Sequence, residues 1–336
     1  MPTISTRRNV LSWARGLLLL LLGIGVIGCS GSKEAATPAW KSAEGYQLQL
    51  RMESGQSYRM ETTMDQTMTM NVMGRTMDME QEQTMFYRYD VTDVADDGGV
   101  QFDYTMTRAM GRVGMPAMGR TMTFDTADST SGGQAGRMSQ RMRAVTGHTV
   151  AVTMSPNGTI RDVQGLEAII EGAVAAQEDS MQARMMRRML SREGVLQQMS
   201  MSFNVYPDGP VQVGDTWSTE STVRFGFPMD MTATYTLSSI KEETAVLDAR
   251  YKLRPPADGE SMRMGGMKMD MDLKGTMEGT VEVDLPTGLA TQSDLSMDLS
   301  GEATISGQRT PMGQSMTMDI QTTGEVSSSI APSGDR

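Results

Sequence analysis

Residues 58–79 read YRMETTMDQTMTMNVMGRTMDM, and in this stretch methionines recur at alternate positions. In the first part the repeated set falls on even numbers: Tyr58, Met60, Thr62, Met64, Gln66, Met68 and Met70. After Asn71–Gly74 the methionines move to odd numbers, as in Met77 and Met79. A period of two places alternate side chains on one face of a β-strand. A parity change across a glycine-containing turn keeps that face continuous in a hairpin, so the stretch predicts a β-hairpin with its sulfurs on one face.

The second half of the chain repeats this pattern. Met262 and Met264 precede Gly265–Gly266, and the methionines then continue at Met267, Met269 and Met271. Other strand-like runs are separated by turn sequences at 96–99, 155–158 and 286–288. The one convincing helical periodicity runs from Leu166 to about Arg192. We therefore predict a mainly β (α+β) fold with a duplicated arrangement: long antiparallel strands in a curved sheet or half-open barrel, with one inserted helix near 165–192.

Four segments are expected along the chain. Residues 1–28 are predicted to be a signal peptide, and residues 29–44, which lack periodicity, a tether. Residues 45–205 are expected to form a β-rich half that contains the helix. Residues 206–330 are expected to form a second β-rich half.

The N-terminal segment has the parts of a secretory signal. Three arginines precede an apolar run at 17–27, and Val26-Ile27-Gly28-Cys29 closes the segment. The run is shorter than the roughly 20 residues that a transmembrane helix needs. A cysteine in this place resembles the lipobox of bacterial lipoproteins. The resemblance implies cleavage before Cys29, a diacylglycerol on its sulfur and anchoring to a membrane through fatty-acyl chains. Ser30 then favours the outer membrane, facing the periplasm.

A second resemblance comes from two turn sequences. Residues 155–160, SPNGTI, and residues 210–217, PVQVGDTW, are similar to an uncharacterised family of bacterial envelope lipoproteins. The resemblance implies a location in the cell envelope and implies no particular activity.

Composition excludes most kinds of chemistry. The net charge is −11, and removal of a leader with three arginines and no acidic residue makes it −14. Such a surface repels nucleic acid. His148 is the only histidine, which excludes a multi-histidine metal site, and the only cysteine is assigned to lipid. The sequence has no nucleophile elbow and no phosphate-binding loop. We therefore expect no enzymatic activity, no cofactor, no metal site and no nucleic-acid partner.

The 36 methionines leave three interpretations open. They fill the core, they line a cavity for an apolar or amphiphilic ligand, or they bind Cu(I), which thioethers prefer. The favoured hypothesis is a ligand cavity, and the alternatives are a structural or assembly partner in the envelope and a Cu(I)-binding protein. The helix methionines Met181, Met185 and Met189 would cover the mouth of the cavity. The residues predicted to line it are Met60, Met64, Met68, Met70, Met77, Met79, Met267, Met269 and Met271.

Overall fold

The large antiparallel sheet that the sequence predicts is present, and the sheet is not closed. The computed structural model describes residues 37–72, 74–130, 132–175, 196, 199, 203, 205–224, 228–256, 262–264, 267–307 and 315–334. Cys29, Met73 and the helix methionines Met181, Met185 and Met189 lie outside these residues. Within the described part of the chain, no helix has the length and apolar character needed to cross a membrane.

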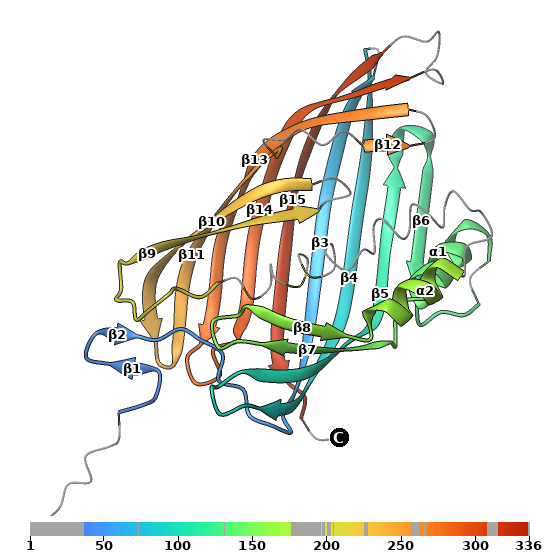
Figure 1. The fold of residues 1–336 in the computed structure, drawn as a ribbon. Coiled ribbons are helices and arrows are strands. Elements are labelled where there is room, and N and C mark those ends of the chain that lie inside the picture. The colour runs from blue at the N-terminus through green and yellow to red at the C-terminus, as the bar shows by residue number, and fades with distance from the viewer. Residues whose placement is uncertain are drawn as a thin grey trace, which may run out of the picture. The chain divides into compact units, whose positions relative to one another are not determined.

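Thirteen strands form one sheet in the order β8-β7-β5-β4-β3-β15-β14-β13-β11-β10-β9, with β12 on β13 and β6 on β5 (Figure 1). Each described pair is antiparallel. A separate pair consists of β1 (Lys41–Ser42) and β2 (Gly45–Tyr46). The strands of the large sheet are β3 (Ser57–Val72), β4 (Arg75–Val94), β5 (Val100–Met115), β6 (Arg120–Asp125), β7 (Thr149–Met154), β8 (Ile160–Gln164), β9 (Thr216–Arg224), β10 (Pro228–Lys241), β11 (Thr244–Arg254), β12 (Met262–Met264), β13 (Met267–Asp284), β14 (Ala290–Gly307) and β15 (Met316–Pro332).

The two halves of the chain meet where the first long strand pairs with the last. β3 pairs with β15 over most of its length, from Tyr58↔Pro332 to Val72↔Met318. The strands of the predicted halves 45–205 and 206–330 therefore continue through one sheet. Pro38–Arg336 form a single compact unit, and it contains the buried core of the described residues.

The methionine hairpins have the register that their parity predicts. Met68 lies opposite Met79 and Met70 lies opposite Met77 on β3 and β4. Met262 lies opposite Met269 on β12 and β13. Residues directly opposite in an antiparallel pair share one face, so the hairpin prediction is confirmed at both places.

The methionines of β3 and β4 share one face of the sheet with Met269 and Met271 of β13, and we call it the inner face. The pairs Met70↔Ile320, Ile320↔Gly301 and Gly301↔Leu273 connect β3 to β13 through β15 and β14. Most of the buried core lies on this face, with Leu50 and Tyr206 packed against it. In Figure 1, β7–β8 and β9–β10 turn in front of the long strands.

The outer face is polar and solvated, as one face of an antiparallel sheet commonly is. Threonine, serine and charged residues alternate with the inner residues along β3, β10 and β14. Exposed ion pairs join the strand residues Arg88 and Asp90, at 2.6 Å, and Arg112 and Glu82, at 2.8 Å. The period of two therefore separates an uncharged layer from a charged one.

Two helices have described bounds, rather than one, and Leu196, Met199 and Phe203 are also helical. α2 (Leu166–Ala175) begins where the sequence predicts, and the rest of the predicted span, 176–192, lies outside the described residues. α1 (Gly133–Arg143) was not predicted, because its glycine-rich sequence has weak helix propensity. A tertiary contact stabilises α1: the backbone N–H of Asp125 on β6 donates to the buried Ser139 Oγ at 3.2 Å. The 3₁₀ helix η1 (Pro116–Met118) connects β5 to β6.

Candidate functional site: a cavity on the inner face

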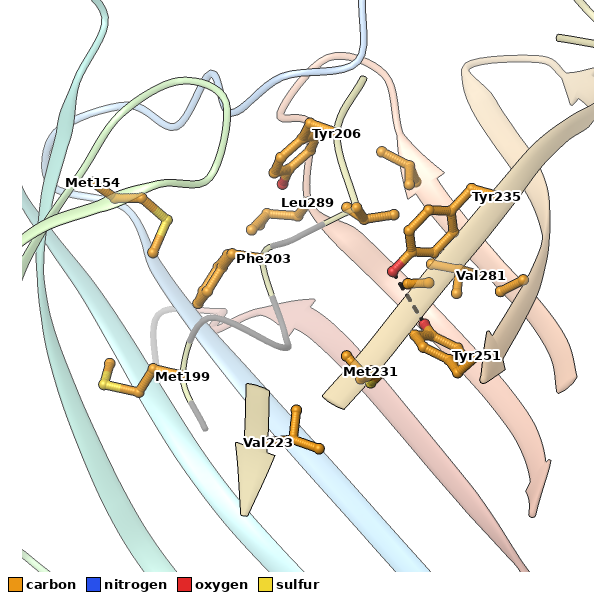
Figure 2. Packing of buried hydrophobic residues seen from close by; sticks show 14 of the residues in the cluster. Met154, Met199, Phe203, Tyr206, Val223, Met231, Tyr235, Tyr251, Val281 and Leu289 are labelled. Carbon is orange, nitrogen blue, oxygen red and sulfur yellow. Dashed lines mark hydrogen bonds between the residues drawn. The ribbon is translucent and has the colours of Figure 1, made fainter. Parts of the chain in front are cut away.

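A cavity of about 200 Å³ lies on the inner face and draws its walls from both halves of the chain. Figure 2 shows Met199, Phe203, Tyr235, Tyr251, Val281 and Leu289 from this wall. Its lining residues are Met60, Thr62, Met85, Tyr87, Tyr89, Tyr104, Met199, Phe203, Val205, Tyr235, Tyr251, Met277, Val281, Leu289, Ala290, Ser293, Leu295, Val326, Ser328 and Ile330.

One wall is built by aromatic residues of β4 and β5. Tyr87 stacks on Tyr104 with ring centroids 5.2 Å apart, and Phe203 meets the ring of Tyr89 edge-on at 6.2 Å. The hydroxyls of two tyrosines are directed at methionine sulfurs. Tyr87 donates to Met85 Sδ at 3.1 Å, and Tyr89 donates to Met60 Sδ at 3.0 Å. Both phenol hydroxyls therefore donate their hydrogen bonds to other residues of the same wall.

The opposite wall contains a second tyrosine pair, on β10 and β11. The hydroxyl of Tyr235 donates to the hydroxyl of Tyr251 at 3.3 Å, and Figure 2 marks this bond with a dashed line. The two rings meet at 87°, and Trp217 stacks on Tyr235 from the edge strand β9. Burial raises the pKa of Tyr87 to about 12 and raises the pKa values of Tyr235 and Tyr251 as well. These phenols are neutral at physiological pH.

Three hydroxyl side chains cross the floor of the cavity in a row. Ser293 lies opposite Ser328, and Ser328 lies opposite Thr62, on β14, β15 and β3. We call these three residues the hydroxyl row. It is flanked by Val281 on one side and by Met85 on the other. Thr62 Oγ1 is buried and has no hydrogen-bond partner among the residues that the structure describes.

Among the residues that the structure describes, no acidic or basic side chain lines the cavity. The described parts of the chain also hold no group of three or more histidine, cysteine, aspartate or glutamate residues that would bind a metal ion. The candidate site is thus an uncharged chamber with a few hydroxyl groups.

The predicted lining methionines are distributed along the inner face rather than gathered in the cavity. Met60 lines the cavity, and Met64 lies opposite the lining residue Val326. Further along the sheet are Met68, Met70, Met77, Met79, Met269 and Met271, which do not line it. Only the backbone of Met267 is described.

Sequence reasoning missed the aromatic part of the site. Tyr87 and Tyr89 share the odd parity of Met85 on one strand, which was the available signal. Phe203 and Met199 had no such signal, because they belong to the connection between α2 and β9 and reach the cavity through the tertiary fold.

Comparisons with known proteins find a family but no characterised relative. A sequence profile described as "Family of unknown function (DUF6263)" matches residues 97–290. No curated protein matches the chain.

Among solved structures, a lipovitellin, reported under lipid–protein interactions, has 10% sequence identity and a TM-score of 0.41. That similarity covers 84% of this chain and 26% of the lipovitellin chain, so this chain spans about a quarter of it. The outer membrane protein OprG from Pseudomonas aeruginosa has 6% identity and a TM-score of 0.23, with 84% of this chain and 99% of that chain covered. We base no conclusion on similarities of this strength.

Proposed function

The chain belongs to the DUF6263 family, and we propose that it is a lipid-anchored, non-enzymatic protein of the bacterial envelope that binds an apolar or amphiphilic molecule. The binding site is the cavity on the inner face. The observation that supports the proposal is an uncharged cavity of about 200 Å³ between walls of tyrosine, methionine and aliphatic side chains.

The size and lining of this cavity distinguish it from an ordinary packing defect. Protein interiors are close-packed, and voids larger than a water molecule are few. An apolar cavity of about 150 Å³ is enough to hold a benzene molecule. Methionine is flexible and polarizable, so Met60, Met85, Met199 and Met277 provide a wall that adapts to ligands of different shape.

The test is binding of an uncharged fluorescent dye, N-phenyl-1-naphthylamine, to the chain from Pro38 to Arg336. We expect saturable binding at micromolar concentration. Val326→Trp, which places an indole in the cavity, should abolish it. The matched control is Met269→Trp, on the same face but outside the cavity, which should leave dye binding intact.

Both variants must unfold at similar denaturant concentrations for the comparison to hold. Dye binding that persists in Val326→Trp would place the ligand elsewhere. If the dye does not bind at all, the role of a structural or assembly partner in the envelope takes first place.

The anchor rests on the sequence around Cys29, which the structure does not describe. The tether then joins the sheet to a lipidated Cys29 in the outer membrane. Cys29→Ala should leave an uncleaved precursor that incorporates no labelled fatty acid such as palmitate. A Cys29→Ala protein that is processed normally and stays with the membrane fraction would refute this part of the proposal.

A second candidate function, Cu(I) binding, is favoured by one arrangement of residues. Met68 opposes Met79 and Met70 opposes Met77, so four thioethers share one patch of the inner face. Opposed Cβ atoms are about 5 Å apart, and thioether is a ligand that selects Cu(I). We expect the chain not to compete with a chromogenic Cu(I) chelator. Competition that is lost on changing these four residues to leucine, but kept on changing Met267, Met269 and Met271, would establish the metal function.

A further inference from the structure

The floor of the cavity has a polar stripe in an otherwise apolar layer. Thr62, Ser328 and Ser293 stand on three neighbouring strands, at directly opposed positions, and all three line the cavity. Thr62 Oγ1 is buried and has no hydrogen-bond partner within the described ranges of the chain, although buried hydroxyls are usually hydrogen-bonded. A ligand with a polar group at this place would satisfy it.

The polar group that fits this place is uncharged. No charged side chain in the described part of the chain lines the cavity, and the inner positions of β3 from Tyr58 to Met70 are tyrosine, methionine, threonine and glutamine only. The inner positions of β15 from Met316 to Ile330 likewise carry no charge. A carboxylate, phosphate or ammonium group would be desolvated there without a counter-charge, which is strongly unfavourable.

Hydroxyl side chains have the chemistry to pair with a neutral polar group. Each serine or threonine hydroxyl is one donor and also an acceptor, so the row can donate to a carbonyl or exchange hydrogen bonds with an alcohol. The hydroxyls of Tyr87, Tyr89 and Tyr235 donate their protons within the walls, so these three phenols have no proton left for a ligand.

We infer that the ligand is a neutral amphiphile, with its hydroxyl or ester carbonyl on the hydroxyl row formed by Thr62, Ser328 and Ser293 and its hydrocarbon part against the methionine and tyrosine walls. This inference rests on the proposed function and specifies its ligand class. It excludes ionised fatty acids and the charged headgroups of phospholipids from the cavity.

The experiment displaces bound N-phenyl-1-naphthylamine from the chain of Pro38–Arg336 with four ten-carbon competitors. These are 1-decanol, methyl decanoate, decanoate and decyltrimethylammonium. At about pH 8 the carboxyl group is ionised. We expect decanol and the methyl ester to bind at least about a hundredfold more tightly than either ion, because burial strongly disfavours a charged group. Decanoate should improve as the pH falls and its carboxyl group becomes neutral.

Two variants test the position of the polar group. Thr62→Val and Ser328→Ala each remove one hydroxyl with little change in shape. Each variant should lower the affinity for decanol by roughly two- to tenfold relative to the affinity for the dye, because one hydrogen bond contributes about that much to binding. The control is Thr63→Val on the outer face of the same strand, which should change neither affinity.

The outcomes separate the two proposals. If the dye binds but decanoate at about pH 8 competes as well as decanol, the inference about a neutral ligand is wrong and the proposed function stands. If decanol affinity is unchanged in both hydroxyl variants, the row does not hold the ligand. If no dye binds, both proposals fail. The four competitors are compared on the unaltered chain, so the inference about a neutral ligand can be tested even if a variant fails to fold.

Discussion

At the residue scale, the Thr62 hydroxyl is expected to lower the stability of the empty protein and to strengthen ligand binding. Its hydroxyl is buried on the cavity floor and finds no hydrogen-bond partner among the described residues. The neighbouring Thr63 points to the outer face, where its hydroxyl lies 3.4 Å from that of Thr84. Two adjacent threonines thus offer a matched comparison, because one lacks a partner and the other has one.

We expect Thr62→Val to raise the free energy of unfolding of the empty protein by about 1 kcal/mol, because it removes an unsatisfied buried polar group. Thr63→Val should lower it by about 0.5–1.5 kcal/mol, since it removes a hydrogen bond. Urea denaturation followed by circular dichroism measures both. A Thr62→Val protein less stable than the unaltered chain would mean that the hydroxyl is satisfied in the ligand-free state.

The buried tyrosines give the protein an alkaline limit. Burial raises the pKa values of seven of the eight tyrosines, that of Tyr87 to about 12. The unfolded chain releases these protons near pH 10, whereas the folded chain keeps them. The stabilisation is therefore complete below about pH 10 and is lost as the pH rises through the folded-state values.

We predict cooperative unfolding above about pH 10, with tyrosinate absorbance appearing together with the loss of circular dichroism. Tyr87→Phe removes one of these groups and should make the decline of stability with pH less steep. Ionisation of all tyrosines near pH 10 with an intact fold would contradict the burial that raises their pKa values.

At the element scale, the turn between β13 and β14 joins the sheet to the N-terminal part of the unit. Gly288 adopts φ +73° in this turn, and a Cβ placed on it would clash with the carbonyl oxygen of Gln49. Tyr206 donates its hydroxyl to the Gly288 carbonyl at 2.8 Å, and Arg51 N–H donates to the Thr287 carbonyl at 2.7 Å. Three distant segments therefore meet at this glycine.

Gly288→Ala should lower the free energy of unfolding by roughly 3 kcal/mol, because it adds a steric clash to an unfavourable backbone conformation. The control is Gly74→Ala in the β3–β4 turn, with φ +76° and no atom within 4 Å of the added Cβ, which should cost about 1 kcal/mol. Equal losses in the two variants, measured by urea denaturation, would show that the contact with Gln49 is not tight.

The elements also show which features the sequence was able to predict. Alternation over 58–79 predicted β3, β4 and their shared face, because period two directly reports which side chains lie on one side. α1 and β6 were missed, since their stability comes from contacts such as Ser139 with Asp125 rather than from local propensity. The alternation also predicted that the methionines share one face. It did not show which of them line the cavity beside Phe203, because the position of Phe203 depends on how the chain crosses the sheet.

At the scale of the whole molecule, the cavity exists only when both predicted halves are in place. Met60 and Tyr87 come from the first half, Tyr235, Met277 and Val326 from the second. A division into independent halves at about residue 205 would therefore leave the site incomplete. Ligand binding is accordingly expected to be lost in either half expressed alone.

The pairing of β3 with β15 sets the order in which this protein acquires its structure. When β3 leaves the ribosome or an export channel, only its partner β4 follows closely, and its second edge stays open until residues 316–332 have been delivered. Pairing of segments this distant in sequence is slow, and an open strand edge invites aggregation. Pairing of the seventeen residues of β15 is thus the step that completes the sheet. A chain truncated before β15 has two unpaired strand edges, on β3 and β14. Such a fold favours delivery of the complete chain before assembly begins.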